Sequence, residues 1–483
     1  MTRFPFRSPA AWLMLIGLLL FKGPLEAADL VAVAIFHVYP APPGEPLSSR
    51  FTVTVGKKNT PVYLARVVAL TPEQREKLHQ SELADTSEAS FTSFDMWGRV
   101  DISVTCPEPI QSVKLLPSSS GITPVISGNR LTFTVTKPGQ LTLEVNGDWI
   151  NSLHLFANPL ETDAPRPDDP NVIYYGPGVH EVESVQVGSG KTVYIAGGAV
   201  LYGKIGPGCP GGPIFVLHGS NIVLRGRGII DGSRFPKPSP GGNILAAYGT
   251  NIQVEGVILR DSSSWTFPVK NCDQVKIRNI KIFGWRGNSD GIDICNSRKV
   301  EVTDCFLRTF DDLVVIKSDD KMAGDTRDIT VKNCVLWNEF AHALSLGAEL
   351  RMPIENVLFS DCDIIHDKGR EWDLRVYNCD SAAVKNIVFD NIRIEESRRL
   401  FSLWIGKAIW SNEAERGHID DVTFRNISSP LPERASSPAD FVGFDAEHAI
   451  HKVQFDHVLI GGRSLQSSDI KQNEFVQEVS IKP

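Results

Sequence analysis

Three aspartates lie close together in the sequence. Asp290 stands in the run Asn288-Ser289-Asp290-Gly291, and Asp311 and Asp312 follow in the run Phe310-Asp311-Asp312. Carboxyl groups that share a small site shift each other's pKa values, so that one keeps its proton while another stays ionised. Such a set can protonate a leaving oxygen and activate water, the two tasks of glycosidic-bond hydrolysis. Aspartate is also a common turn and cap residue, so the cluster alone is equally compatible with a structural role.

The sequence around these aspartates repeats. Short segments recur in which polar residues lead into an alternation of apolar, often β-branched residues, and the leading apolar residues are 23 to 35 residues apart. This period is typical of solenoids, and the segments carry strand and turn signals without a helical pattern. We therefore predict an all-β fold with a right-handed parallel β-helix over residues 161–483, rather than a flat sandwich with coincidental spacing. The leading residues are Ile222, Ile252, Val275, Val300, Ile329, Val357, Ile387, Val422 and Val453.

A column of apolar residues supports the solenoid. From the second segment on, an apolar residue stands five positions after each leading residue, whereas Arg227 takes this place in the first segment. Eight cysteines in an exported protein would suggest disulfides, but three of them fall in this column, so we expect small buried core residues there. The cysteine and histidine spacings contain no zinc motif. The column consists of Val257, Ile280, Cys305, Cys334, Cys362, Ile392, Ile427 and Val458.

Stacked coils bring distant residues together. Counted from the leading residue of its own coil, Asp290 lies 15 positions in, Asp311 lies 11 in, His342 lies 13 in and Arg375 lies 18 in. These residues belong to four consecutive coils, which stack about 4.8 Å apart, so we expect them on one face within about 15 Å. Neighbouring strand residues point to opposite sides, so Asp311 and Asp312 can share a site only where a strand ends in a turn.

Residues 28–160 have a different pattern. Alternating apolar and polar segments are separated by turn signals such as Gly128-Asn129 and Pro138-Gly139, which predicts an antiparallel β-sandwich domain. Thr71 followed by Pro72 predicts a short helix over residues 71–78. The acidic, proline-rich stretch 161–170 is the expected linker. Such a domain can bind glycan or cap the first coil, and we expect the capping role.

Residues 1–27 have the order of a secretory signal peptide. Arg3 and Arg7 precede an apolar run at residues 10–20, and small residues at Ala27-Ala28 mark the cleavage site. A membrane anchor is the alternative, but the run is short for a bilayer span. The sequence therefore predicts a secreted or periplasmic protein without a membrane partner.

The net charge bears weakly on the partners. It is −8, and removal of residues 1–27 changes it to about −10. This mild acidity does not favour nucleic acid or an anionic membrane, and it weakly disfavours a strongly polyanionic substrate. We expect a monomer that acts on a polysaccharide or oligosaccharide and needs neither cofactor nor metal.

Four sequence blocks resemble the signature blocks of polygalacturonases, glycoside hydrolase family 28. They occur in the family's order and begin at Asn288, Phe310, Ala341 and Arg375. The resemblance covers roughly residue 168 to the C-terminus and implies a right-handed parallel β-helix and hydrolysis with inversion of the anomeric centre. It also implies roles for single residues: Asp311 as general acid, Asp290 and Asp312 as activators of water, His342 as a group that tunes the acid, and Arg375 as a substrate ligand.

The chain departs from the family pattern at several positions. Ser289 stands where the family usually has threonine, and Ala341 and Ala343 replace the glycines that flank the histidine. Tyr377 replaces a lysine that would suit a uronate carboxylate, and a tyrosine suits a neutral sugar instead. The sandwich followed by a β-helix also resembles the related family 49 of dextranases and isopullulanases. The resemblance thus leaves a pectin-type substrate and a neutral glycan both open.

Further binding residues are weaker candidates. Asn288 belongs to the first block, Lys317 and Glu349 can line a cleft, and Trp372 is favoured among the solenoid tryptophans because it precedes Arg375. For inversion, the carboxyl group of Asp311 should lie roughly 6.5–9.5 Å from that of a partner. Two alternative functions remain. A polysaccharide lyase would need a basic residue to abstract a proton, and a non-catalytic carbohydrate-binding solenoid would need no acid at all.

Overall fold

A computed structural model describes residues 34–71, 74, 77, 85–206, 212–236, 242–433 and 437–482. The expected signal peptide at residues 1–27 lies outside these ranges, and so does most of the short helix expected at residues 71–78. From residue 34 onward the chain forms one compact unit. Among the described residues, no helix is long and apolar enough to cross a lipid bilayer.

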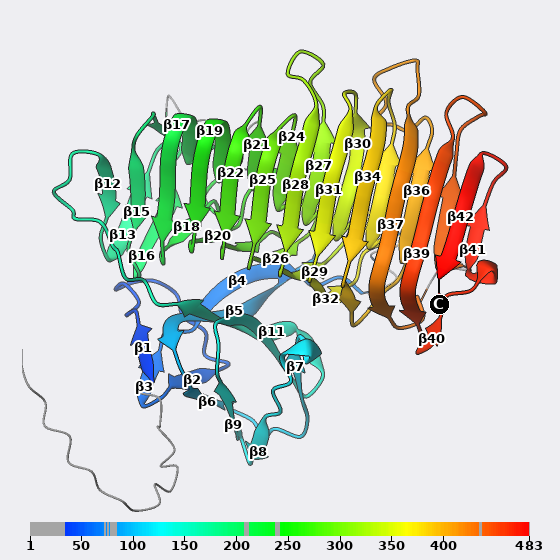
Figure 1. Ribbon diagram of the computed structural model, residues 1–483. Coiled ribbons are helices and arrows are strands. Elements are labelled where there is room, and N and C mark those ends of the chain that lie inside the picture. Colours follow the sequence, from blue (N-terminus) through cyan, green and yellow to red (C-terminus); the bar gives the residue numbers. More distant parts are fainter. Residues whose placement is uncertain are drawn as a thin grey trace, which may run out of the picture. The chain divides into compact units, whose positions relative to one another are not determined.

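The larger part of the fold is a sheet of 31 strands that winds as a solenoid from β12 to β42 (Figure 1). Each coil contributes up to three strands, and each strand pairs in parallel with its counterpart in the next coil, which makes three stacks. The predicted right-handed parallel β-helix is confirmed.

The strands divide among the stacks as follows. Stack 1 contains β12 (Val172–Tyr175), β15 (Thr192–Ile195), β22 (Asp273–Arg278), β25 (Arg298–Thr303), β28 (Thr326–Lys332), β31 (Ile354–Ser360), β34 (Ala383–Asp390) and β42 (Val476–Lys482). Stack 2 contains β13 (Gly178–Val182), β16 (Ala199–Gly203), β18 (Ile229–Asp231), β20 (Ile258–Arg260), β23 (Lys281–Phe283), β26 (Phe306–Thr309), β29 (Val335–Asn338), β32 (Asp363–Asp367) and β35 (Arg393–Ile394).

Stack 3 contains β14 (Val185–Val187), β21 (Phe267–Lys270), β24 (Ile292–Cys295), β27 (Val314–Ser318), β30 (Leu344–Leu350), β33 (Leu374–Asn378), β36 (Phe401–Ile405), β38 (Ala439–Val442) and β41 (Ile470–Gln472). Four long strands pass from one stack into another: β17 (Phe215–Gly226), β19 (Leu245–Glu255), β37 (His418–Ser429) and β39 (Ile450–Ile460). The small strand β40 (Arg463–Ser464) pairs antiparallel with β39, and η2 (Ser467–Asp469) is a 3-10 turn.

The turns between stack 1 and stack 2 are uniform. From β22 to β35 each consists of two residues, at 279–280, 304–305, 333–334, 361–362 and 391–392, and we call them the short corners. The first residue of each is Asn or Asp with a φ between 53° and 58°, a left-handed conformation that these side chains tolerate. Asn333 donates to the Asp304 carboxylate at 2.6 Å, and Asn391 donates to Asp361 at 2.7 Å, so neighbouring coils are linked.

The second residue of each short corner belongs to the predicted apolar column. All eight column residues are at most 3% exposed and lie in the solenoid core. Cys305, Cys334 and Cys362 are buried free thiols, as expected from their place in the column. In the first coil, where the column is interrupted, Arg227 forms a buried ion pair with Asp95 of the N-terminal region at 2.7 Å.

The turns between stack 2 and stack 3 vary in length. They span residues 284–291, 310–313, 339–343 and 368–373 in four consecutive coils, and we call them the long corners. Every candidate catalytic residue from the sequence lies in a long corner, and the strands that follow fix its position.

The N-terminal region consists of two facing sheets. One contains, in order, β1 (Ile35–Val38), β5 (Thr86–Trp97), β11 (Asp148–Pro159), β10 (Gly139–Val145) and β7 (Val113–Leu116), with β4 (Tyr63–Val68) on β5. The other contains β3 (Lys58–Thr60), β2 (Thr52–Val55), β6 (Val100–Thr105), β9 (Arg130–Val135) and β8 (Val125–Ser127). Pairing is antiparallel except between β5 and β11, and η1 (Ser118–Ser120) follows β7. Apolar residues fill the space between the sheets, as in a sandwich.

The sandwich does not cap the first coil, and that expectation is wrong. The outer face of its first sheet packs against stack 2 in a core that extends along the solenoid from Val200 to Ile365. Phe91 stacks on Phe283 with ring centroids 5.3 Å apart, and Phe156 lies 5.2 Å from Phe306. The sheet is therefore apolar on both faces and covers the side of the solenoid.

Candidate active site

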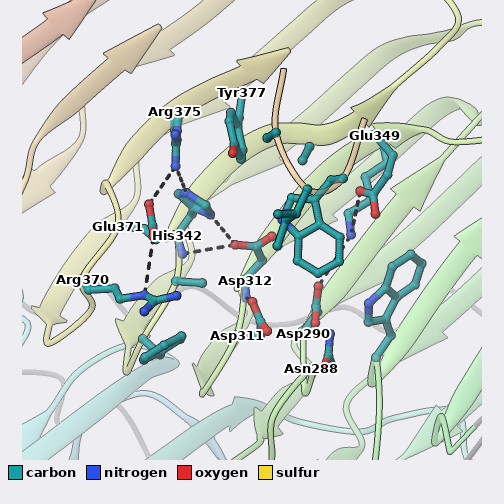
Figure 2. A pocket seen from close by; sticks show the side chains of 18 residues that line it. Asn288, Asp290, Asp311, Asp312, His342, Glu349, Arg370, Glu371, Arg375 and Tyr377 are labelled. Atoms are coloured by element: carbon teal, nitrogen blue, oxygen red, sulfur yellow. Dashed lines mark hydrogen bonds and ion pairs between the residues drawn. The ribbon is translucent and has the colours of Figure 1, made fainter. Parts of the chain in front are cut away.

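The long corners bring the candidate residues into one column. Asp290, Asp312 and His342 each stand two residues before a strand of stack 3, and these strands pair in register through Ile292, Val314 and Leu344. The three side chains therefore occupy equivalent positions in successive coils, about 4.8 Å apart. Figure 2 shows them facing one cavity.

A bend lets two adjacent aspartates share this cavity. β26 ends at Thr309 and β27 begins at Val314, so Asp311 and Asp312 lie in the corner between them. The Thr309 hydroxyl donates to the Asp311 carbonyl oxygen at 2.9 Å and holds the chain in the bend. The expected junction of strand and turn is thus present.

The three carboxyl groups are buried and close together. One oxygen each of Asp290, Asp311 and Asp312 lies within 4.8 Å of the others, and the residues are 3%, 4% and 9% exposed. These oxygen distances are shorter than the 6.5–9.5 Å that we expected between the carboxyl groups of an inverting pair.

The pKa values of the adjacent aspartates shift in opposite directions. Burial and the neighbouring Asp312 charge raise the pKa of Asp311 to about 7. Burial also acts to raise the pKa of Asp312, but its interaction and hydrogen bonds with His342, together with the Lys317 charge, lower it below the ordinary value. The ring Nδ1 of His342 lies 2.6 Å from Asp312 Oδ1, and its backbone N–H donates to the same oxygen at 3.1 Å.

Asp290 belongs to a second buried group. Burial raises its pKa well above the ordinary value, and the charges of Asp293 and Asp311 act in the same direction. Lys317 on β27 lies 3.8 Å from Asp290, 3.4 Å from Asp293 and 3.6 Å from Glu349, so one ammonium group serves three carboxyl groups. The Oδ1 atom of Asp290 is buried and has no hydrogen-bond partner among the described residues.

His342 connects the aspartates to Arg375. Arg375 Nη1 lies 2.9 Å from His342 Nε2, and a guanidinium group can only donate, so Nε2 accepts and the ring proton lies on Nδ1. That proton is donated to Asp312, not to Asp311. The expected tuning of the acid by His342 stays a prediction, and its direct contact is with the neighbouring carboxylate of Asp312.

The column opens into a cavity of about 480 Å³. The expected binding residues Asn288, Lys317, Arg375 and Tyr377 line it, but Trp372 does not. Trp372 occupies the corner position equivalent to His342, yet its ring lies under the Arg399 guanidinium at 5.7 Å and is 8% exposed. Its placement in the cleft is the one expectation about lining residues that the structure contradicts.

Several residues that line the cavity were not singled out as binding residues from the sequence. They are Trp265, Phe340, Arg370, Glu371, Ile409 and Trp410, and Asp293 lies just behind them beside Lys317. Asp293 could have been predicted as a functional residue, because it stands between Ile292 and Ile294 in a strand whose other residues are apolar. Glu371 and Arg370 carry no such signal, because corner residues of this kind are ordinarily solvated.

The acidic trio also has the composition of a cation site. Asp290, Asp311 and Asp312 each offer one oxygen, and hard divalent cations prefer such ligands. Lys317 already supplies a positive charge 3.8 Å from Asp290, so the charge of the trio is compensated within the protein.

Comparisons with known proteins agree with this geometry. The sequence model of glycosyl hydrolases family 28 matches residues 221–479, more than half of the chain. A polygalacturonase of Juniperus ashei is 27% identical over 179 residues, which are 35% of this chain and 34% of that protein, so the match spans about a third of its length.

Two solved structures share the fold. Dex49A from Penicillium minioluteum matches 92% of this chain and 96% of its own, with a TM-score of 0.61 at 13% identity. A hyperthermoactive exopolygalacturonase from Thermotoga maritima matches 64% of this chain and 84% of its own, with a TM-score of 0.50 at 17% identity. Because the family match covers more than half of the chain and contains the whole column from Asp290 to Arg375, the chain belongs to glycosyl hydrolases family 28.

Proposed function

We propose that the enzyme hydrolyses a glycosidic bond by acid–base catalysis with Asp290, Asp311 and Asp312, and that it inverts the anomeric centre. One observation supports this division of labour above all others. Two adjacent carboxyl groups in one buried corner have pKa values shifted apart, to about 7 for Asp311 and below the ordinary value for Asp312. A protonated acid beside an ionised base is the state that hydrolysis requires.

The proposed reaction is one displacement. Asp311 gives its proton to the glycosidic oxygen as the bond from that oxygen to the anomeric carbon breaks. A water molecule bonds to the same carbon and loses its proton to Asp312, while a carboxyl oxygen of Asp290 accepts a hydrogen bond from that water. The extra proton on Asp312 then returns to Asp311 through solvent, because the two groups are adjacent.

The spacing of the carboxyl groups does not argue for inversion. Their nearest oxygens lie within 4.8 Å, whereas two-carboxyl inverting enzymes usually keep about 6.5–9.5 Å between them. We base inversion on the family resemblance and on the third carboxyl group. A retaining enzyme needs one acid and one nucleophile, and a second carboxylate beside the base suits the positioning of water.

One assay separates the candidate mechanisms. The protein is incubated with galacturonan, rhamnogalacturonan, dextran and pullulan, and products are followed by proton NMR of the anomers and by ultraviolet absorbance. Inversion predicts that the first product carries the opposite anomeric configuration to the substrate, and retained configuration would contradict it. Growth of the absorbance of an unsaturated uronate would mean a lyase. Absence of any cleavage, with binding intact, would favour the non-catalytic solenoid.

Export is part of the same proposal. The charged, apolar and small-residue order of residues 1–27 supports a signal peptide, and a polymeric substrate outside the cell would require one. Expression of the full chain in a secreting host should give a mature protein that begins at Ala28. Amino-terminal sequencing of the exported protein checks this, and an intact Met1 in the product would contradict it.

A further inference from the structure

We infer that the cleft takes a neutral glycan rather than a polyuronate, because each cation that lines it is matched by a protein carboxylate and aromatic rings form much of the remaining wall. This inference rests on the proposed hydrolase function and names the substrate class of the same site. It concerns Arg375, Arg370 and Lys317, the three cationic lining residues in the described part of the chain.

Arg375 is already engaged with a carboxylate. Its Nη1 lies 2.9 Å from Glu371 Oε2 and also donates to His342, and its guanidinium stacks on the Tyr377 ring at 3.8 Å. Burial acts to raise the pKa of Glu371, but the charges of Arg375 and Arg370 lower it, so Glu371 is ionised. Glu371 thus already supplies Arg375 with one carboxylate, at Nη1, so a uronate carboxylate at this guanidinium would lie beside an existing anion.

The other two cations are matched as well. Arg370 lies 3.6 Å from Glu371 and stacks over the Phe340 ring at 4.6 Å. Lys317 lies within 3.8 Å of Asp290, Asp293 and Glu349 and stands 4.0 Å over the Trp265 ring. Uronate binding at either group would bring a second anion beside an existing one.

The total charge of the residues that line the cavity also disfavours a polyuronate. Five carboxyl groups face three cations, and if Asp290 and Asp311 keep their protons the count is three against three. A polyuronate would therefore enter a cleft with no surplus of positive charge, and it would lose hydration without gaining a free partner. The hydroxyl groups of a neutral sugar can donate to these carboxylates at no such cost.

Aromatic side chains supply the apolar contact that sugar rings use. Tyr377 lies in β33 beside Trp404, with ring centroids 5.0 Å apart, and stands where the family usually has lysine. Trp265 also lines the cavity, and so do Ile409 and Trp410, which are 88% and 37% exposed. Rings with an apolar face and a polar edge match the alternating faces of a neutral pyranose.

A matched pair of ligands tests the inference. Binding to the Asp311→Asn variant is measured by calorimetry with oligogalacturonates as free acids and as methyl esters, which differ in charge and by one methyl group per sugar, and with neutral glucan and galactan oligosaccharides. We expect methyl esters to bind at least as tightly as the acids, and a neutral oligosaccharide to bind most tightly. Tighter binding of the free acids than of every uncharged ligand would overturn the inference.

The two proposals can fail separately. Cleavage of polygalacturonate in preference to every neutral glycan would overturn the substrate class and leave the hydrolase intact. A neutral preference in binding, without turnover of any glycan by the wild-type enzyme, would overturn the hydrolase and leave the binding preference.

Two variants sharpen the test. Glu371→Gln frees Arg375 from its carboxylate, and Tyr377→Lys restores the family's cation. Each should raise the ratio of free-acid to methyl-ester affinity by roughly tenfold, since a charge pair in the site is exchanged for a free cation. Glu355→Gln, at a residue on the outer face of stack 1, is the matched control and should leave the ratio unchanged. An unchanged ratio in both cleft variants would contradict the inference.

Discussion

The short corners and the long corners of this solenoid differ in what their polar residues do. A short corner has two residues, and from Asp304 to Asn391 its Asn or Asp side chain is exposed or half-buried, with bonds between coils from Asn333 to Asp304 and from Asn391 to Asp361. A long corner is longer and irregular, and two of its buried carboxyl groups, Asp290 and Asp373, each have an oxygen without a hydrogen-bond partner in the described part of the chain. The short corners therefore stabilise the stack of coils. The long corners hold buried polar groups whose function we assign to the substrate site.

The largest expected effect comes from the acid in a long corner. Asp311→Asn keeps the size of the side chain but cannot give up a proton, so kcat should fall about 10²- to 10⁴-fold. Steady-state kinetics on the best substrate of the panel measures this, and the unfolding midpoint should stay within a few degrees of wild type. Activity that survives the change would show that another group is the acid.

A smaller kinetic effect is expected one coil further. His342→Ala removes the ring N–H that lies 2.6 Å from the Asp312 carboxylate and helps to keep it ionised. We expect kcat/KM to fall about 10- to 100-fold, the equivalent of one hydrogen bond to a charged group. The acidic limb of the pH profile should also move to higher pH. A merely structural role for His342 would leave that limb in place.

The pH profile itself compares the two aspartates of one corner. Asp311 must be protonated, and with its pKa raised to about 7, kcat/KM should be present below this pH and fall above it. Asp312 must be ionised, and because its pKa is lowered, the acidic limb should lie below the ordinary aspartate value. Rates at constant ionic strength from pH 3 to 9 check both limbs, and a profile that is flat through neutral pH would contradict the assignment.

The smallest expected effect belongs to a short corner. Asn333 has a φ of 53° and donates to Asp304. Asn333→Ala should lower the free energy of unfolding by about 1–2 kcal/mol because alanine is strained in the left-handed region. Asn333→Gly, which tolerates that backbone, should lose less. Denaturant unfolding measures both variants. The kcat values of both variants should match that of the wild type. A large loss of kcat would contradict the claim that short corners serve stability and long corners serve catalysis.

The difference between corners also explains what the sequence could predict. Because every short corner from β22 to β35 has two residues, counting five positions from each leading apolar residue found the whole buried column, Cys305 included. The same count placed Asp290 and His342 at offsets of 15 and 13, although they occupy one register position, because corner length varies. The side-chain direction in a long corner also escapes counting, which is why Trp372 was misplaced.

The prediction that the sandwich caps the first coil is wrong for a different reason. Phe91 and Phe94 lie on opposite faces of β5 and are both fully buried, one against the solenoid and one inside the sandwich. A sheet that is apolar on both faces must pack against another layer on each face. The apolar residues at both alternating positions of β5 indicate this in the sequence. The sequence pattern does not indicate which part of the chain packs against the outer face of the sheet.

The central claim is that adjacent carboxyl groups in one long corner titrate far apart. Carbon-13 NMR of protein labelled at aspartate carboxyl carbons measures this directly, with Asp311→Asn and Asp312→Asn used to assign the resonances. We expect the Asp311 resonance to titrate near pH 7 and the Asp312 resonance to titrate below the ordinary aspartate range. If both resonances titrated together near pH 4, the usual value for aspartate, the proposed division into acid and base would be contradicted.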